Sequence, residues 1–276
     1  MASREAAEAA QYATDKNLQT RIDTHCRYGI GHGRDIFGQV TQAMAQVRAH
    51  PERILDVGAG NGNWYRVIRS ELGSGPSYSG LDQSEGMLAR LSRMMEDDPR
   101  GEALLGDAQA LPWQDATFAW VGLHFMLYHV SDIARALSEA YRVLQSGGVL
   151  TACTNDHHPY RELWELGEQV ARDLGLPDLA PPMSERFNLA NGAAFFPERP
   201  LVHSVPGGFR FHRAEPAVRY MASGPILLHL GKAADDPDLT ARALKRLDER
   251  IRERIMRDGV FEVHSASGYF LLKKPE

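Results

Sequence analysis

The sequence predicts an α/β fold, in which helices cover both faces of a doubly wound, mostly parallel sheet of seven strands. Short apolar runs alternate with amphipathic segments between residues 53 and 154, and a glycine-rich turn follows the first run. This alternation is typical of parallel strands that are joined by right-handed helical crossovers. With 276 residues and 43% apolar content, the chain can bury such a sheet and its helices.

The individual elements follow from apolar spacing and from the residues that interrupt it. Ile36, Val40 and Met44 recur at helical intervals, and Pro51 ends this helix just before an apolar run opens the first strand. The same alternation continues downstream. We expect helices at 35–48, 64–72, 84–95, 133–144 and 161–174, and strands at 53–58, 77–82, 103–105, 118–123 and 149–154.

The two ends of the chain have a less regular pattern. The composition of residues 2–18 favours a helix, and the glycines within 21–33 predict a pliable turn after it. Near the C-terminus, Pro206-Gly207-Gly208 separates two apolar runs and predicts a hairpin. We also expect a charged helix at 239–256 and strand material at 260–272.

These elements predict four parts of the chain. Residues 1–48 form an N-terminal helical cap, and residues 49–156 form the sheet core. Residues 157–235 form an inserted lid with late strands, and residues 236–276 supply a helix and a final strand that complete the core. We expect the cap and the lid to close over a small molecule, because closing segments exclude water and shape the pocket.

Composition and charge exclude several classes of function. The formal net charge of −5 leaves no basic excess for non-specific nucleic-acid binding, so no nucleic acid partner is expected. The first residues carry acids where a signal peptide would be basic, and no apolar run reaches the roughly 18 residues of a membrane span. We therefore expect a cytoplasmic protein with no membrane partner. Cys26 and Cys153 form no CxxC pair, which argues against zinc and iron–sulfur sites.

The most informative segment is Asp56-Val57-Gly58-Ala59-Gly60-Asn61-Gly62, between the first strand of the core and the next helix. Glycines at alternate positions lack the Cβ atoms that would keep a ligand from main-chain N–H groups, so this turn predicts a nucleotide pocket. The spacing differs from the Gly-x-Gly-x-x-Gly of dinucleotide enzymes and lacks the Lys of phosphate-binding loops. It therefore disfavours NAD and ATP as the ligand.

Two acids follow the next two strands. Asp82 ends the second strand, where a doubly wound sheet presents a carboxylate to a ribose diol. Asp107 follows the third strand, where a carboxylate can accept a hydrogen bond from an adenine amino group. Each acid alone is equally well explained as the N-cap of the following helix. Together with the glycine turn, their order predicts a nucleoside site.

Four ordered segments resemble the motifs of class I S-adenosylmethionine-dependent methyltransferases. They are 54–62 (ILDVGAGNG), 80–88 (GLDQSEGML), 106–112 (GDAQALP) and 142–148 (RVLQSGG). Segments 24–28, 126–130 and 187–192 are more loosely similar to bacterial small-molecule methyltransferases. The resemblance implies a Rossmann-like core, S-adenosyl-L-methionine as cofactor, S-adenosyl-L-homocysteine as product, and in-line methyl transfer to a small-molecule acceptor, with a place in biosynthesis of a specialised metabolite.

The resemblance also implies roles for individual residues. The glycine turn would hold the methionine part of the cofactor, Asp82 the ribose and Asp107 the adenine. The residues expected at the cofactor are Tyr28, Asp56, Gly58, Ala59, Gly60, Asp82, Gln83, Asp107, Ala108 and His124.

Histidine is the natural base for an acceptor that must lose a proton near neutral pH. His124 is the first candidate, because it follows the fourth strand at the edge where open α/β sheets bind ligands. Methyl transfer can also proceed without a base, because the donor is already activated. The other candidates are His25, Tyr28, His32, His129, His157 and His158.

No metal site is expected, because the fourth strand ends without a carboxylate and Asp156-His157-His158 has no evident further ligands. Two alternatives remain. The first is an RNA or protein methyltransferase, which is disfavoured by the acidic balance and by the absence of an Asn-Pro-Pro-Tyr-type tetrapeptide. The second is a protein that binds the cofactor without methylating a substrate. The sequence leaves open the acceptor, the methylated atom (N, O, C or S), the use of a base and the oligomeric state, a homodimer included.

Overall fold

The computed structural model describes residues 15–31, 36–157, 159–176 and 185–276. The chain divides into two compact units. Unit 1 comprises Met1–Arg34, His158–Pro182 and Pro206–Ala266, and unit 2 comprises Asp35–His157, Met183–Val205 and Ser267–Glu276.

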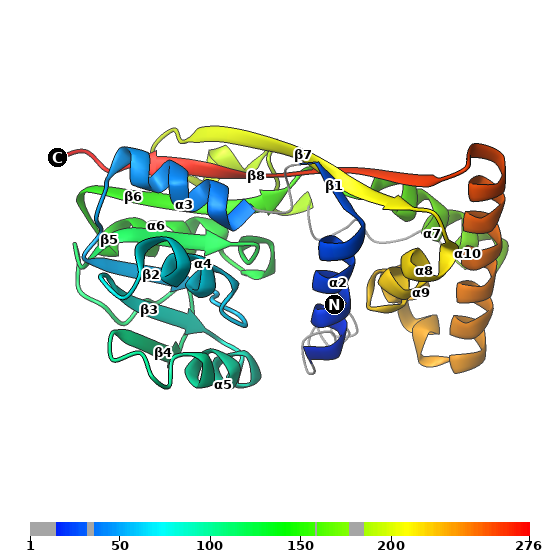
Figure 1. Ribbon diagram of the computed structural model, residues 1–276, viewed down its shortest axis with the longest axis horizontal. Coiled ribbons are helices and arrows are strands. Elements are labelled where there is room, and N and C mark those ends of the chain that lie inside the picture. The colour runs from blue at the N-terminus through cyan, green and yellow to red at the C-terminus, as the bar shows by residue number, and fades with distance from the viewer. Residues whose placement is uncertain (1–14, 32–35, 158, 177–184) are drawn as a thin grey trace. The chain divides into compact units, whose positions relative to one another are not determined.

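The described strands are β1 (Gly29–Gly31), β2 (Arg53–Val57), β3 (Ser77–Asp82), β4 (Gly101–Leu105), β5 (Phe118–His124), β6 (Leu144–Asn155), β7 (Leu201–Phe211) and β8 (Phe261–Lys273). They form one sheet in the order β1-β7-β8-β6-β5-β2-β3-β4 (Figure 1). The pairs from β6 to β4 are parallel, whereas β1 with β7 and β6 with β8 are antiparallel. The predicted α/β class and mostly parallel sheet are confirmed, with eight strands in place of the predicted seven.

The described α-helices are α2 (Asp15–Tyr28), α3 (Ile36–Val47), α4 (Asn63–Leu72), α5 (Glu85–Met94), α6 (Ile133–Val143), α7 (Arg161–Asp173), α8 (Ala214–Ala222), α9 (Pro225–Leu230) and α10 (Pro237–Asp258). Side-chain caps explain where several of them begin. Ser84 accepts a hydrogen bond from the Met87 N–H at the start of α5, and Asp132 accepts one from the Arg135 N–H at the start of α6.

In unit 2, successive strand residues pack against helices on opposite faces of the sheet. Ile54 and Trp120 join a core with α3, α4 and α5, whereas Leu55 and Val121 join a core with α6. Figure 1 shows α3 and α4 in front of the strands and α6 behind them. Strands that are buried on both faces by helices are the defining feature of a doubly wound fold.

The strand order reverses between β2 and β5. The chain runs outward from β2 through β3 to β4, and then returns with β5 on the other side of β2. In open α/β sheets such a reversal opens a crevice beyond the carboxyl ends of the strands. The glycine turn follows β2 and Phe125 follows β5, so both lie at this edge of unit 2.

Unit 1 has its own apolar core, built from α7, α8, α9 and α10 and from the aromatic residues of β7 and β8 that belong to this unit. A Cβ atom at Gly208 would lie 1.9 Å from the carbonyl oxygen of Val263, so this close approach requires glycine. Pro206 precedes the residues that pair with β1, and its missing N–H interrupts no bond to that strand. The predicted hairpin is therefore wrong, because Pro206 and the two glycines lie within one continuous strand, β7.

The turn predicted within 21–33 is also wrong for its described part. The helix α2 continues to Tyr28, because residues 21–28 contain neither glycine nor proline, and β1 begins at Gly29. The remaining residues of that segment lie outside the described residues, as do 1–14 and 177–184. The roles of cap and lid stay predictions. No described helix combines the length and the apolar character that crossing a membrane requires.

Candidate functional site

The turn after β2 has the backbone conformation that its glycines predict. Gly58, Gly60 and Gly62 have φ angles of 71°, 56° and 79°. The N–H groups of Gly58 and Ala59 donate to the carbonyl oxygen of Leu81 at 2.7 and 3.0 Å, which fixes the turn against β3. A Cβ atom at Gly60 would meet only the Gly58 carbonyl oxygen, at 4.0 Å. The main chain is therefore open at this position, as a ligand lying against it requires.

A side chain is excluded at Gly58 for a different reason. A Cβ atom there would lie 2.7 Å from the Cβ and Cγ atoms of Met126, so the side chain that follows β5 packs directly over this glycine. Phe125, between β5 and Met126, has a φ of 57°, which is strained for a bulky residue. The segment after β5 is thus held against the glycine turn at the reversal of strand order.

Asp82 links the loops that follow three neighbouring strands. Its Oδ2 accepts a hydrogen bond from the Gly60 N–H at 2.8 Å, and its Oδ1 accepts one from the Ser84 N–H at 2.9 Å. Its carbonyl oxygen accepts from the Gly106 N–H at 3.0 Å. A carboxylate offers about four lone-pair positions, so Asp82 retains acceptor capacity for two hydroxyl groups. This arrangement fits a ribose diol.

Asp107 follows directly on Gly106 and is exposed, while the next residue, Ala108, is buried. Because Gly106 is bonded to the end of β3, the third predicted acid lies in a loop tied to the same place as the glycine turn. The structure therefore places Gly58, Ala59, Gly60, Asp82, Asp107 and Ala108 in loops that are tied to the end of β3. Gln83 is exposed next to Asp82.

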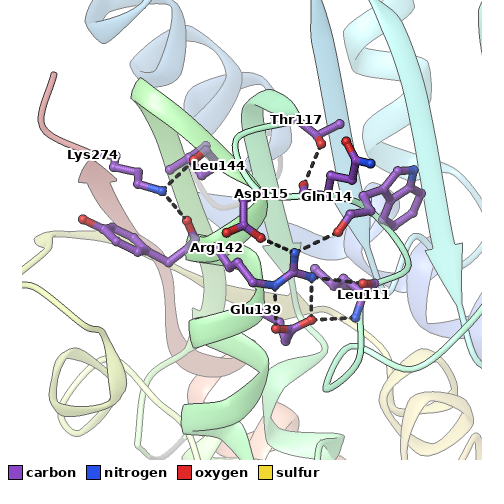
Figure 2. Close-up of polar contacts among 10 residues, drawn as sticks. Leu111, Gln114, Asp115, Thr117, Glu139, Arg142, Leu144 and Lys274 are labelled. Atoms are coloured by element: carbon purple, nitrogen blue, oxygen red, sulfur yellow. Dashed lines mark hydrogen bonds and ion pairs between the residues drawn. The ribbon is translucent and has the colours of Figure 1, made fainter.

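The loop between β4 and β5 is anchored farther along by Arg142 of α6, as Figure 2 shows. Its guanidinium group donates to the carbonyl oxygens of Trp113 and Leu111 at 2.8 and 3.1 Å, and to the Asp115 carboxylate at 2.8 Å. It also makes two 2.8 Å bonds to Glu139, whose Oε2 accepts from the Leu111 N–H. The hydrogen bonds from Arg142 lower the pKa of Glu139, so this buried carboxylate stays ionised.

Asp56, the acid that begins the glycine motif, lies in the core of unit 2. The residue is 2% exposed, and its carboxylate accepts a hydrogen bond from the Tyr78 hydroxyl. Burial raises the pKa of Asp56 to about 7, with a smaller contribution from the charge of Asp82, while the Tyr78 bond opposes the rise. The predicted cofactor role of Asp56 stays a prediction.

His124 is buried on the same face of the sheet. Its Nε2 lies 3.0 Å from the Thr151 hydroxyl, and its ring packs edge-on against Trp64 with 4.4 Å between ring centroids. Within the described chain its Nδ1 has no hydrogen-bonding partner. Burial lowers the pKa of His124 to about 3, so the ring is neutral and weakly basic near pH 7. Its predicted roles as base and cofactor contact stay predictions.

The other candidates for a base are placed in both units. In unit 1, the hydroxyl of Tyr160 lies 3.2 Å from His25 Nε2, and burial lowers the pKa of His25 to about 4. Tyr28 belongs to the same unit, where its ring centroid lies 5.3 Å from that of Phe211. In unit 2, His157 is exposed, and its Nδ1 lies 3.4 Å from Asn188 Nδ2. His32 and His158 lie outside the described residues.

Two residues at this edge, Met126 and Gln109, lie in segments that resemble methyltransferase motifs, but the sequence analysis assigned neither a role. Met126 packs on Gly58, and Gln109 contacts the Asp107 carboxylate. Their positions in those segments do not reveal the contacts, because the Met126 contact with Gly58 and the Gln109 contacts with Ser131 and Asp132 depend on how separate loops meet. Among the residues described, no three His, Cys, Asp or Glu side chains gather closely enough to hold a metal ion.

Comparison with known proteins gives the class that the sequence motifs resemble, the methyltransferases. Residues 54–148 match the family model of the methyltransferase domain. The demethylmenaquinone methyltransferase of Staphylococcus carnosus is 28% identical over 183 residues, which are 65% of this chain and 75% of that protein. Other proteins of that name are 36% identical over 114 residues, so the chain spans about half their length, 48%.

Solved structures show the fold beyond the matched domain. A putative type II methyltransferase from Anaeromyxobacter dehalogenans superposes with a TM-score of 0.59 at 16% identity, over 87% of this chain and 97% of that one. The [4+2]-cyclase SpnF superposes with a TM-score of 0.56 at 18% identity, over 99% of this chain and 97% of that one.

The fold, the glycine turn and the ordered acids are those that the sequence analysis expects of a nucleoside-binding α/β enzyme. Together with the methyltransferase-domain match over residues 54–148, the fold and the relatives support a class I S-adenosylmethionine-dependent methyltransferase. The predicted family and enzyme class are confirmed.

Proposed function

We propose that this methyltransferase transfers a methyl group from S-adenosyl-L-methionine to a small-molecule acceptor by in-line displacement. The observation that carries the proposal is the convergence on Asp82. The Asp82 carboxylate accepts a hydrogen bond from the Gly60 N–H, and the main-chain carbonyl oxygen of Asp82 accepts one from the Gly106 N–H. The three loops therefore meet before any ligand binds. A site ordered in advance loses little entropy on binding.

The chain's own residues would divide the work of holding the cofactor. Asp82 would accept hydrogen bonds from the ribose hydroxyls, Asp107 from the adenine amino group, and the open glycine turn would lie against the methionine part. S-adenosylmethionine, when bound, supplies a methyl carbon already activated by a sulfonium. The protein's task is therefore to orient the acceptor and to exclude water.

A small molecule is favoured as the acceptor for two reasons. The net charge of −5 gives no general attraction to RNA, and the relatives that match beyond the core are named for a small molecule, demethylmenaquinone. Demethylmenaquinone is therefore the first defined acceptor to assay. RNA and protein remain the alternatives that the experiment must separate.

The acceptor class can be tested with methyl-labelled cofactor and a cell extract. We would divide the extract by ultrafiltration into small molecules and retained macromolecules, and incubate each fraction with the purified protein. The proposal predicts label in the small-molecule fraction that is absent with Asp82→Ala. Label confined to retained RNA or protein would contradict it, and cofactor binding without labelled product in any fraction would favour a non-methylating role.

The base prediction needs its own test, because His124 is neutral and buried. If His124 takes a proton from the acceptor, His124→Gln should lower kcat by about 100-fold or more and leave cofactor affinity nearly unchanged. The measurement is kcat and KM for both substrates across pH. An unchanged pH profile and kcat in a folded His124→Gln protein would assign the ring to the core.

A further inference from the structure

One side chain holds the carboxylate that is expected to meet the adenine. The Nε2 of Gln109 lies 3.1 Å from both Oδ1 and Oδ2 of Asp107, and the Gln109 N–H donates to Oδ1 at 2.9 Å. Gln109 thus donates hydrogen bonds to the Asp107 carboxylate from both its main chain and its side chain. Because its oxygens offer about four lone-pair positions, acceptor capacity remains on the exposed side for a ligand donor.

The other end of the Gln109 amide fixes its orientation. Its Oε1 accepts from the Asp132 N–H at 3.0 Å and from the Ser131 hydroxyl at 2.8 Å. A backbone N–H can only donate, so the amide oxygen must face Asp132 and the amide nitrogen must face Asp107. The reverse orientation would set an amide oxygen against a carboxylate and an NH₂ group against a donor.

The backbone of Gln109 is held as well. Its carbonyl oxygen accepts from Arg135 Nε at 3.2 Å, and Arg135 lies in the first turn of α6. Gln109 is therefore connected at its side chain and at its main chain to the segment that begins α6. Because Gln109 is fixed at both places, its hydrogen bonds hold the Asp107 carboxylate in one orientation.

We propose that Gln109 is a positioning residue for adenine recognition, which aims the Asp107 carboxylate at the 6-amino group of the cofactor and couples it to the start of α6. This inference rests on the proposed function, since it assumes that Asp107 meets the adenine. Hydrogen bonds to a charged acceptor are strong only when the acceptor is well directed. Loss of the Gln109 donor should therefore weaken binding of adenine in particular.

The chain offers a substitution that removes one half of the bridge. Gln109→Glu keeps an oxygen for Ser131 and Asp132 but replaces the donor that faces Asp107 by a second carboxylate. Gln109→Met removes the donor without adding charge. Gln114→Glu is the matched control, because Gln114 is an exposed residue of the same loop for which only a main-chain contact is described.

The test measures adenine preference, which a merely structural role would not move. Calorimetry would give the Kd of S-adenosylhomocysteine and of the analogue whose base is unsubstituted purine, which lacks the 6-amino group. In the wild-type protein and in Gln114→Glu we expect adenine to bind about tenfold more tightly than purine. In Gln109→Glu and Gln109→Met that ratio should fall close to one, with the Kd for the purine analogue nearly unchanged.

Turnover provides a second readout that separates positioning from folding. With either Gln109 variant, KM for S-adenosylmethionine should rise while kcat changes little. If both folded variants keep the wild-type preference for adenine, Gln109 is only a structural link and the inference is overturned. If the wild-type protein binds neither compound, the proposed function itself fails, which is distinguishable from failure of the Gln109 inference.

Discussion

The carboxylates of unit 2 that accept backbone N–H groups differ from a buried histidine of unit 1. At the loop edge of unit 2, Asp82 and Glu139 each accept backbone N–H groups, and Glu139 also has an arginine partner. In unit 1, His229 is 1% exposed, and neither of its ring nitrogens has a hydrogen-bonding partner within the described chain. These two carboxylates of unit 2 are therefore stabilised in their charged form, whereas burial favours the neutral form of His229 in unit 1.

We expect the carboxylates of unit 2 to serve ligand binding and the buried histidine of unit 1 to make stability depend on pH. Carboxylates that are already bonded to the backbone can hold a polar ligand with little rearrangement. A histidine enclosed beside Trp164, with 4.3 Å between ring centroids, contributes packing only while it is uncharged. Three substitutions test the comparison, from the largest expected effect to the smallest.

Asp56, like His124, departs from this pattern within unit 2, because its carboxyl group is buried and no backbone donor to it is found among the described residues. Its pKa is raised from 3.8 to about 7 in the folded protein, so the folded state keeps a proton that the unfolded state loses between those values. Stability from this group is present at low pH and is lost as pH rises toward 7. Asp56→Asn, which cannot ionise, should gain up to about 4 kcal/mol over the wild-type protein at pH 8 and little at pH 4.

Urea unfolding of the two proteins at both pH values measures this difference. Other titrating groups are common to both proteins and cancel in the comparison. A gain that is the same at pH 4 and pH 8 would show that Asp56 does not titrate in the folded state. Unchanged affinity of Asp56→Asn for S-adenosylhomocysteine would assign the residue a structural role.

His229 should make unit 1 sensitive to acid. Burial lowers its pKa from 6.5 to about 4, so its stabilising contribution is present above 6.5 and is lost as pH falls toward 4. His229→Phe should abolish that part of the loss, which is about 3 kcal/mol at most. The readout is the free energy of unfolding at pH 7.5 and pH 4.5. Replacing the exposed His212 with Gln is the control, and equal acid sensitivity in wild type and His229→Phe would contradict the account.

Arg142 tests the ionic anchor of unit 2. Arg142→Leu leaves Glu139 buried without its cation, and should destabilise the protein by about 2 kcal/mol, less than a fully buried pair because the arginine is partly exposed. Thermal unfolding measures the loss. Arg252 of unit 1 pairs with Asp248 and Glu215 on the surface, so Arg252→Leu should leave the melting temperature unchanged. If Arg142→Leu and Arg252→Leu lowered the melting temperature equally, the expected difference between the partly buried and the surface ion pairs would be contradicted.

The parts of the fold that could be predicted from sequence are those whose signal is local. The apolar run of β2, the glycine turn and Asp82 lie where residue type and spacing place them. In contrast, α8 and α9 were not predicted, because no single spacing pattern separates them from the irregular residues around them. The continuity of β7 depends on Val263 lying against Gly208, which is a contact between distant residues.

The same contrast holds within the candidate site. Asp107 could be predicted because it follows a strand, but Gln109 could not, since its importance arises from Ser131 and Asp132 meeting its amide. His124 lies at the end of β5, where the pattern placed it, yet the pattern could not reveal that Trp64 and Thr151 enclose its ring. The order of strands and loops in the sequence predicts which edge of the sheet carries the candidate site. The burial and hydrogen bonding of each side chain there depend on tertiary contacts.

The central claim is that the loops converging on Asp82 form the cofactor site. Calorimetric titration with S-adenosylhomocysteine tests it most directly, using the wild-type protein, Asp82→Ala and, as a control, Asp97→Ala at an exposed acid of the same unit. The account predicts that Asp82→Ala weakens binding by about 2–3 kcal/mol, while Asp97→Ala binds as the wild-type protein does. Equal affinity of wild type and folded Asp82→Ala would contradict the account.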